Sequence, residues 1–154
     1  MVEVPLTKGK VALIDDSDLP LVINHKWHFD GAYARMCTWD PATKKSGLVR
    51  LHTLLTGLKH VDHVNLNKLD NRRENLRPCS HKQNCRNQSA KARNVAGFKG
   101  VGFDVERNKW RAQIMIDGRQ HFLGRYEKAE DAARAYDAAA RSQFGEFARP
   151  NFCA

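Results

Sequence analysis

The strongest constraint on the fold lies between residues 98 and 144, where apolar residues recur first at strand spacing and then at helix spacing. Residues 98–103, 109–116 and 119–126 have the pattern of strands, and Asp117-Gly118 is a typical two-residue hairpin turn. A helix is expected from 128 to 144, ending at Gly145. Residues at spacings of three and four form its apolar face: Ala129, Ala132, Ala133, Tyr136, Ala140 and Phe144. The pattern predicts a three-stranded antiparallel sheet packed on one helix.

The first 58 residues predict an N-terminal β scaffold. Strands are expected at 11–14 and 27–38, the second broken by a turn at Asp30-Gly31. A loop is expected at 40–47, followed by a strand at 48–55 that passes into a helical turn ending at Gly57. With the C-terminal sheet and helix, this scaffold predicts an α+β protein.

The middle of the chain, residues 59–87, is polar and rich in Asn and Arg. We expect strands at 60–64 and 76–79 and a turn-rich loop between them. A helix is expected to begin at Ser80, where Ser80 and Gln83 fit a capping box. The sequence thus predicts a first domain at 1–90, a basic linker at 91–97 and a second domain at 98–154.

The positive charge is concentrated in this middle part. The chain has a formal net charge of +9, and residues 59–97 hold nine Lys and Arg against three Asp and Glu. Such a concentration favours a polyanionic partner, because binding phosphates releases counterions. A solvated basic linker is the alternative.

Several classes of protein do not suit this sequence. No apolar run is long enough to span a membrane, and the N-terminus lacks the pattern of a signal peptide, so we expect a cytoplasmic protein with no membrane partner. The four cysteines include no Cys-x-x-Cys pair, which favours reduced thiols. Cys79, His81 and Cys85 could supply three zinc ligands, although their spacing matches no closed site.

One cluster has the residue types needed to hydrolyse a phosphodiester. That reaction needs a cation to neutralise developing charge and a base to activate water. Asp62 and Asn84 offer hard oxygen ligands of the kind that Mg²⁺ prefers, and His63 is a suitable base because imidazole titrates near neutrality. The amide of Asn75 could orient His63. Since neighbours on a regular strand point to opposite faces, Asp62 and His63 reach one site only if the strand is irregular or lies edge-on.

Residues 51–87 resemble the HNH endonucleases of phages and their relatives, which have the ββα-metal fold. The resemblance rests on the Asp62-His63 dipeptide, on DNRRENLR at 70–77 and on QNCRN at 83–87. The stretch LHTLLTG at 51–57 is also similar to the family, with Thr53 where Arg is usual.

The resemblance implies a role for each residue of the cluster. His63 would be the general base, and Asn75 would hold it. Asp62 and Asn84 would bind one divalent cation, Mg²⁺ or another such as Mn²⁺. It also implies a nicking, homing-type enzyme in a phage or bacterial mobile element, acting in the host cytoplasm.

Residues 98–152 resemble the DNA-binding domain of APETALA and ethylene-response-factor proteins. FKGVGF, KWRAQI, FLGRY and AEDAARAYDAAA follow that family's pattern, as does Asn151-Phe152. The resemblance implies that the outer face of the sheet reads duplex DNA. Gly102, Met115 and Phe122 depart from the residues of the plant proteins, so their target preference does not transfer.

Cationic and amide side chains of both parts are the candidates for contact with DNA. They are Arg72, Arg73, Arg77, Lys82, Arg86, Lys99, Arg107, Lys109, Arg111, Gln113, Gln120 and Arg125. Asn65, Asn67 and Asn71 are interpreted as turn-forming residues without a chemical role.

The sequence as a whole predicts a metal-dependent DNA endonuclease that acts on double-stranded DNA as a monomer or weak dimer. Its fold would be a ββα-metal HNH module with the β scaffold, followed by the three-stranded sheet and helix. The alternative is a non-catalytic DNA-binding regulator that retains a nuclease fold.

Overall fold

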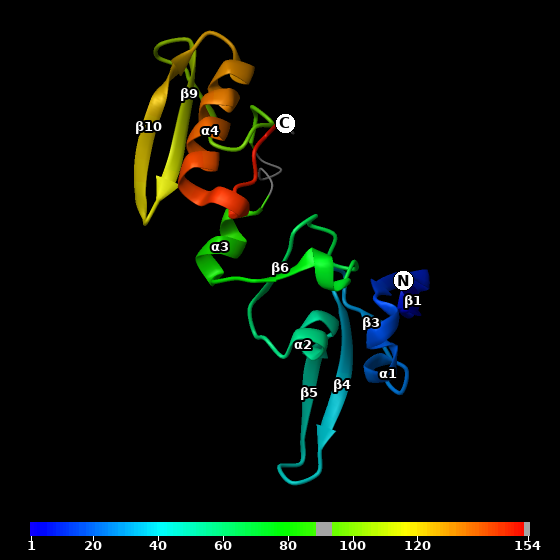
Figure 1. The fold of residues 1–154 in the computed structure, drawn as a ribbon. Coiled ribbons are helices and arrows are strands. Elements are labelled where there is room, and N and C mark those ends of the chain that lie inside the picture. The colour runs from blue at the N-terminus through cyan, green and yellow to red at the C-terminus, as the bar shows by residue number, and fades with distance from the viewer. Residues whose placement is uncertain (89–93, 153–154) are drawn as a thin grey trace. The chain divides into compact units, whose positions relative to one another are not determined.

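The computed structural model describes residues 1–88 and 94–152. They form two compact units, Met1–His81 and Lys82–Ala154, which are drawn in Figure 1. Small sheets and helices occur in both units, which confirms the predicted α+β class. Part of the expected linker, at 91–93, lies outside the described residues, as does Cys153. The expected domain boundaries stay predictions.

The first unit is built from short strands in three small sheets. The strands are β1 (Val2–Pro5), β2 (Val11–Ile14), β3 (His28–Phe29), β4 (Ala34–Asp40), β5 (Lys45–Arg50), β6 (Val61–His63) and β7 (Leu76–Pro78). The helices are α1 (Leu19–Val22) and α2 (Leu51–Thr56), with 3₁₀ turns at Thr7–Gly9, Asp16–Asp18 and Arg73–Asn75. β1 pairs with β2, β4 lies between β3 and β5, and β6 pairs with β7.

The core of the first unit lies between the β4–β5 hairpin, α2 and the N-terminal strands. Ile14, Val22 and Leu51 are almost completely buried there. The indole of Trp27 packs beside them and donates a hydrogen bond of 3.1 Å to the carbonyl of Val22. This core fixes the start of α2 at the end of β5, so the strand expected at 48–55 is wrong from Leu51 onward, where the chain is helical.

The loop between β6 and β7 is held against β2. Leu13 donates its amide to the carbonyl of Leu69 and accepts the amide of Asn71, both at 2.8 Å. Asp70 forms an isolated bridge with Leu13 in the same place. The polar loop therefore has a fixed conformation, because its backbone extends the pairing of the N-terminal strands.

The second unit matches the predicted sheet and helix. Its strands are β8 (Val101–Asp104), β9 (Lys109–Ile116) and β10 (Arg119–Tyr126); its helices are α3 (His81–Arg86) and α4 (Ala129–Phe144), with a 3₁₀ turn at Gly145–Phe147. β9 is the central strand, and α4 packs along it and β10 (Figure 1). None of the helices in the described part of the chain is long and apolar enough to cross a membrane.

Small side chains let α4 lie close to the sheet. Ala132, Ala133 and Ala140 have no exposed surface, and Ala112 and Ile114 face them from β9. Alternate residues of β9 point away, so Arg111 and Met115 are exposed. Asp117 and Gly118 both have positive φ, as the predicted hairpin turn requires.

Asp137 fastens the C-terminal segment to α4. Its buried carboxylate accepts the amides of Asn151 and Phe152 at 2.7 and 2.9 Å. Asn151 in turn pairs with the backbone of Lys99 through its side-chain amide. The Asn-Phe pair noted in the sequence thus joins the end of the second unit to the segment that precedes β8.

Candidate active site

Asp62 and His63 lie at the end of β6, in the short antiparallel pair that β6 forms with β7. Asp62 is opposite Arg77, and His63 is opposite Leu76. The side chains of both residues are buried, with exposed fractions of 3% for Asp62 and 5% for His63. Burial matters here because a buried polar group must be held by specific partners.

Asp62 is held by an ion pair across the two strands. Nη2 and Nε of Arg77 donate to Oδ2 of Asp62 at 2.8 and 3.1 Å. The Arg77 side chain is itself only 14% exposed. A guanidinium with two donors on one carboxylate fixes the orientation of Asp62.

His63 is oriented by Asn71. Nε2 of His63 lies 3.3 Å from Oδ1 of Asn71, and Nδ2 of Asn71 donates to the carbonyl of Leu69 at 3.1 Å. The second bond identifies which amide atom is the oxygen, so the imidazole donates from Nε2. Burial lowers the pKa of His63, although the hydrogen bond to Asn71 and the charge of Asp62 oppose the shift.

Two more rings complete the surroundings of His63. The ring of His52 lies edge-on to it with centroids 5.2 Å apart, and the ring of Tyr33 is 6.2 Å away. His52 is 4% exposed, and burial, followed by the neighbouring charges of His63 and Arg50, lowers its pKa to about 4. His52 therefore packs against His63 as a neutral ring. Tyr33 could not be predicted as a neighbour of His63, because this contact depends on how the hairpin packs.

Asn75 does not hold His63 as expected. Its Oδ1 accepts the amide of Asn65 at 2.9 Å, and its Nδ2 donates to the carbonyl of Asp70 at 2.7 Å. The side chain thus braces the loop at 65–70 from within. Asn71, interpreted from the sequence as a turn former, is the residue that contacts the imidazole, and it is 1% exposed.

Asn84 lies on α3, in the second unit. Among the described residues, no group of three or more His, Cys, Asp and Glu side chains is arranged to hold a metal ion. The expected ligands, Asp62 and Asn84, are instead a carboxylate and an amide. This donor chemistry fits Mg²⁺, which takes oxygen ligands and keeps several waters, so that one or two protein ligands suffice.

The arginines at 72–77 are engaged with carboxylates of their own unit. The pairs are Arg72–Asp70 at 2.8 Å, Arg72–Glu74 at 2.6 Å, Arg73–Asp18 at 2.7 Å and Arg77–Asp62 at 2.8 Å. Asp70 and Asp18 are almost fully buried, so these pairs stabilise the loop and its contact with the N-terminal part. Contact of these arginines with DNA stays a prediction.

Several candidate DNA contacts of the second unit also have partners. The ion pairs are Lys82–Asp117, Arg86–Asp117, Arg107–Asp104, Arg125–Asp104 and Lys109–Glu127. Nζ of Lys99 donates to the carbonyls of Arg86 and Gln88, and its burial lowers its pKa to about 8. Gln120 donates to Gln113 across the sheet, and Arg111 is exposed beside them.

Comparison with known proteins decides the family. An uncharacterized HNH endonuclease of Acanthamoeba polyphaga mimivirus is 31% identical over 153 residues, which cover 94% of this chain and 76% of that protein. The chain belongs to the HNH endonuclease family. No family profile matches it.

Two further proteins match shorter stretches of this HNH endonuclease family member. Protein 3.8 of Escherichia phage T7 is 32% identical over 90 residues, 58% of this chain and 74% of that protein. An ethylene-responsive transcription factor of Arabidopsis thaliana is 50% identical over 60 residues, which are 38% of this chain and 23% of that protein. The plant match is short, and it supports the second resemblance only weakly.

Proposed function

We propose that the protein is a metal-dependent DNA endonuclease with His63 as its general base. The observation that carries this proposal is the setting of His63, a buried imidazole oriented by Asn71 and directly preceded by the buried carboxylate of Asp62. Membership of the HNH endonuclease family supports it. The nuclease module would have the ββα-metal fold that residues 51–87 resemble.

His63 would take the proton from the attacking water. Because Nε2 donates to Asn71, the lone pair for this proton is on Nδ1. The lowered pKa of His63 keeps the imidazole neutral at pH 7, which is the form that accepts a proton. The neutral ring of His52 beside it adds no competing positive charge.

Asp62 and Asn84 would hold the divalent cation, Mg²⁺ or Mn²⁺. When bound, the cation would neutralise the negative charge that develops on the phosphate. Arg77 would keep the Asp62 carboxylate oriented toward it through the ion pair across β6 and β7. One such site handles one strand at a time, so the expected product is a nick.

Residues 98–154 would deliver the nuclease to duplex DNA. We propose that residues 1–90 act as the nuclease and that residues 98–154, joined to it by 91–97, read DNA through the exposed face of β9. Arg111 and Met115 are exposed on that face. The relationship to viral and phage proteins supports a homing-type enzyme of a mobile element that acts in the cytoplasm of its host.

Nicking of a supercoiled plasmid tests the proposal. The full chain should convert supercoiled DNA to open circles in Mg²⁺ or Mn²⁺, and excess EDTA should stop the reaction. Asp62→Ala should reduce the rate strongly, because the cation loses its carboxylate ligand. Duplex binding without cleavage in either metal would support the non-catalytic regulator instead.

A further inference from the structure

Three cations of the first unit differ from the arginines at 72–77. Within the described residues, no carboxylate lies within 4.0 Å of the charged groups of Arg50, Lys59 or Lys68. All three residues are exposed. An arginine that leaves a buried carboxylate to bind a ligand also leaves that carboxylate unpaired, which costs free energy. The three cations named here can bind an anion without this cost.

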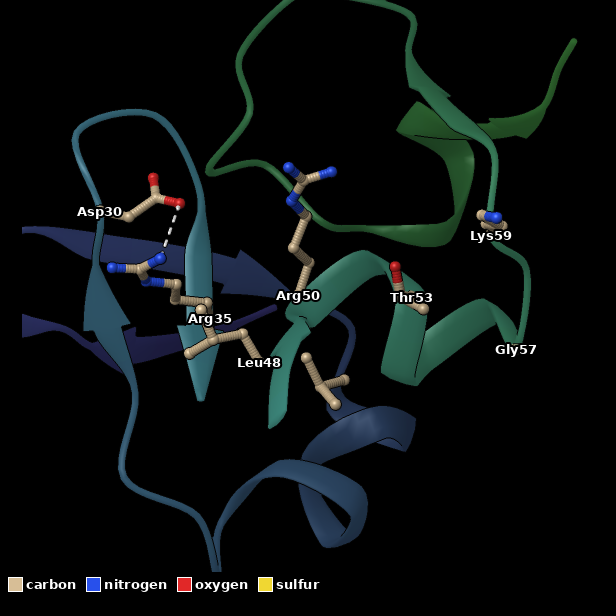
Figure 2. A pocket seen from close by; sticks show the side chains of 8 residues that line it. Asp30, Arg35, Leu48, Arg50, Thr53, Gly57 and Lys59 are labelled. Atoms are coloured by element: carbon tan, nitrogen blue, oxygen red, sulfur yellow. Dashed lines mark ion pairs between the residues drawn. The ribbon is translucent and has the colours of Figure 1, made fainter. Parts of the chain in front are cut away.

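Arg50 and Lys59 line a pocket of about 430 Å³ together with Arg35, Thr53 and one carboxylate, that of Asp30. The cavity has room for a phosphate group. Figure 2 shows the side chains of Arg50 and Thr53 extending to the same side of α2, with Lys59 across from them. We call this cavity the Arg50 pocket.

The pairing of the hairpin brings two cationic residues of the Arg50 pocket onto neighbouring strands. Arg35 of β4 is directly opposite Arg50 of β5. Like charges opposite each other in a sheet are destabilising unless an anion lies between them. Asp30 offsets this only in part, since its nearest oxygen is 3.9 Å from Arg35 and its Oδ1 accepts the amides of Ala32 and Tyr33.

Tyr33 connects the Arg50 pocket to His63. The guanidinium of Arg50 lies 4.6 Å from the centroid of the Tyr33 ring, and Nζ of Lys68 lies 4.8 Å from the same centroid. The ring of Tyr33 also contacts those of His52 and His63, with centroids 5.4 and 6.2 Å apart. Arg50 and Lys68, which have no carboxylate partner among the described residues, are therefore each separated from the proposed base by one side chain, Tyr33.

We propose that the Arg50 pocket binds a backbone phosphate of the DNA strand beside the cleaved bond, with Arg50 and Lys59 as its main contacts. The inference rests on the proposed function, whose scissile phosphate would lie at His63. Arg35 would add charge behind Arg50, and the Thr53 hydroxyl would donate to a phosphate oxygen. Cation–π contact with Tyr33 would hold the Arg50 guanidinium in place before DNA arrives.

Binding without cleavage tests the Arg50 pocket. We would measure the affinity of the full chain for a mixed-sequence 30-base-pair duplex in EDTA, by fluorescence anisotropy over a series of salt concentrations. Arg50→Gln and Lys59→Gln should each weaken binding and should each reduce the slope of log affinity against log salt by about 1. Lys45→Gln is the matched control, because Lys45 is exposed on β5 but lies outside the pocket.

The outcomes separate the two proposals. A slope that falls for Arg50→Gln and Lys59→Gln but not for Lys45→Gln supports the pocket, even if the wild type never cuts DNA. If the slope of log affinity against log salt were the same in all three variants, the phosphate-binding role of the pocket would be wrong. The nuclease proposal would not be affected, because the plasmid assay tests it separately. Circular dichroism of each variant checks folding. If Arg50→Gln is misfolded, the slope of Lys59→Gln decides the test, because Lys59 is on a surface loop.

Discussion

Arg77 and Asp62 face each other across β6 and β7, and both guanidinium hydrogen bonds from Nη2 and Nε are to the same carboxylate oxygen, Oδ2. The pair is nearly buried, with side-chain exposures of 14% and 3%. It joins the acidic residue of the candidate site to the second strand of the same short ribbon. The ion pair thus links the stability of the ribbon to the orientation of Asp62.

Replacing Arg77 should destabilise the first unit. Arg77→Met leaves the buried carboxylate of Asp62 without its guanidinium, and breaking a buried pair in this way costs about 3 kcal/mol. Urea denaturation measures the loss. The double variant Asp62→Asn, Arg77→Met should recover much of it, since no buried charge is then left. If both variants were equally unstable, packing of the Arg77 side chain would be responsible instead.

Asn71 should matter for the reaction and not for DNA binding. Asn71→Ala removes the partner of Nε2, so the ring loses its fixed orientation, and kcat should fall roughly 10- to 100-fold. KM and affinity for duplex DNA should stay close to the wild type. Asn67→Ala, in the same loop but exposed, is the control. Equal losses in the two variants would mean that the loop, and not the contact with His63, is what matters.

Much of the second unit could be predicted from the sequence. Alternation along β9, the Asp117-Gly118 turn and the alanine spacing of α4 are local signals, and the structure confirms each of them. The bounds of the strand predicted at 48–55 are wrong, because β5 begins at Lys45 and ends at Arg50. Pairing with β4 extends this strand into the expected loop.

The candidate site was harder to predict because its contacts join distant parts of the chain. Asp62 and His63 were found from their residue types, but the partner of His63 was expected to be Asn75. An Asn that orients a ring has the same sequence signal as one that forms a turn. Only the pairing of β2 with the 65–71 loop brings Asn71 to the ring. The Arg50 pocket likewise depends on the register of the β4–β5 hairpin.

His52 should make the first unit sensitive to acid. Its pKa is about 4 in the folded chain against about 6.5 unfolded, so the unfolded state binds more protons between these values. The free energy of unfolding should therefore fall as pH decreases from 6.5 to 4, by at most about 1.4 kcal/mol for each pH unit. Thermal melts at several pH values measure this. His52→Phe keeps a ring beside His63 and should flatten the dependence, and an unchanged slope would show that other groups cause it.

Gly100 should be irreplaceable in the second unit. Its φ is +76°, and a Cβ there would lie 2.0 Å from Cδ2 of Tyr136. Gly100→Ala should lower the free energy of unfolding by about 3 kcal/mol, from overpacking and backbone strain together. Gly97→Ala is the matched control, since φ is +70° there but nothing lies within 4 Å of the added atom. Equal effects in chemical denaturation would mean that the backbone conformation alone explains the cost.

The single-turnover nicking rate of His63→Ala, with enzyme in excess over supercoiled plasmid and Mg²⁺ present, tests the central claim most directly. The rate should fall roughly 10²- to 10⁴-fold, because the water loses its base, while affinity for duplex DNA stays the same. His25→Ala, an exposed histidine of the same unit, should cut at the wild-type rate. Cleavage by His63→Ala at the wild-type rate would contradict the assignment of His63 as the general base.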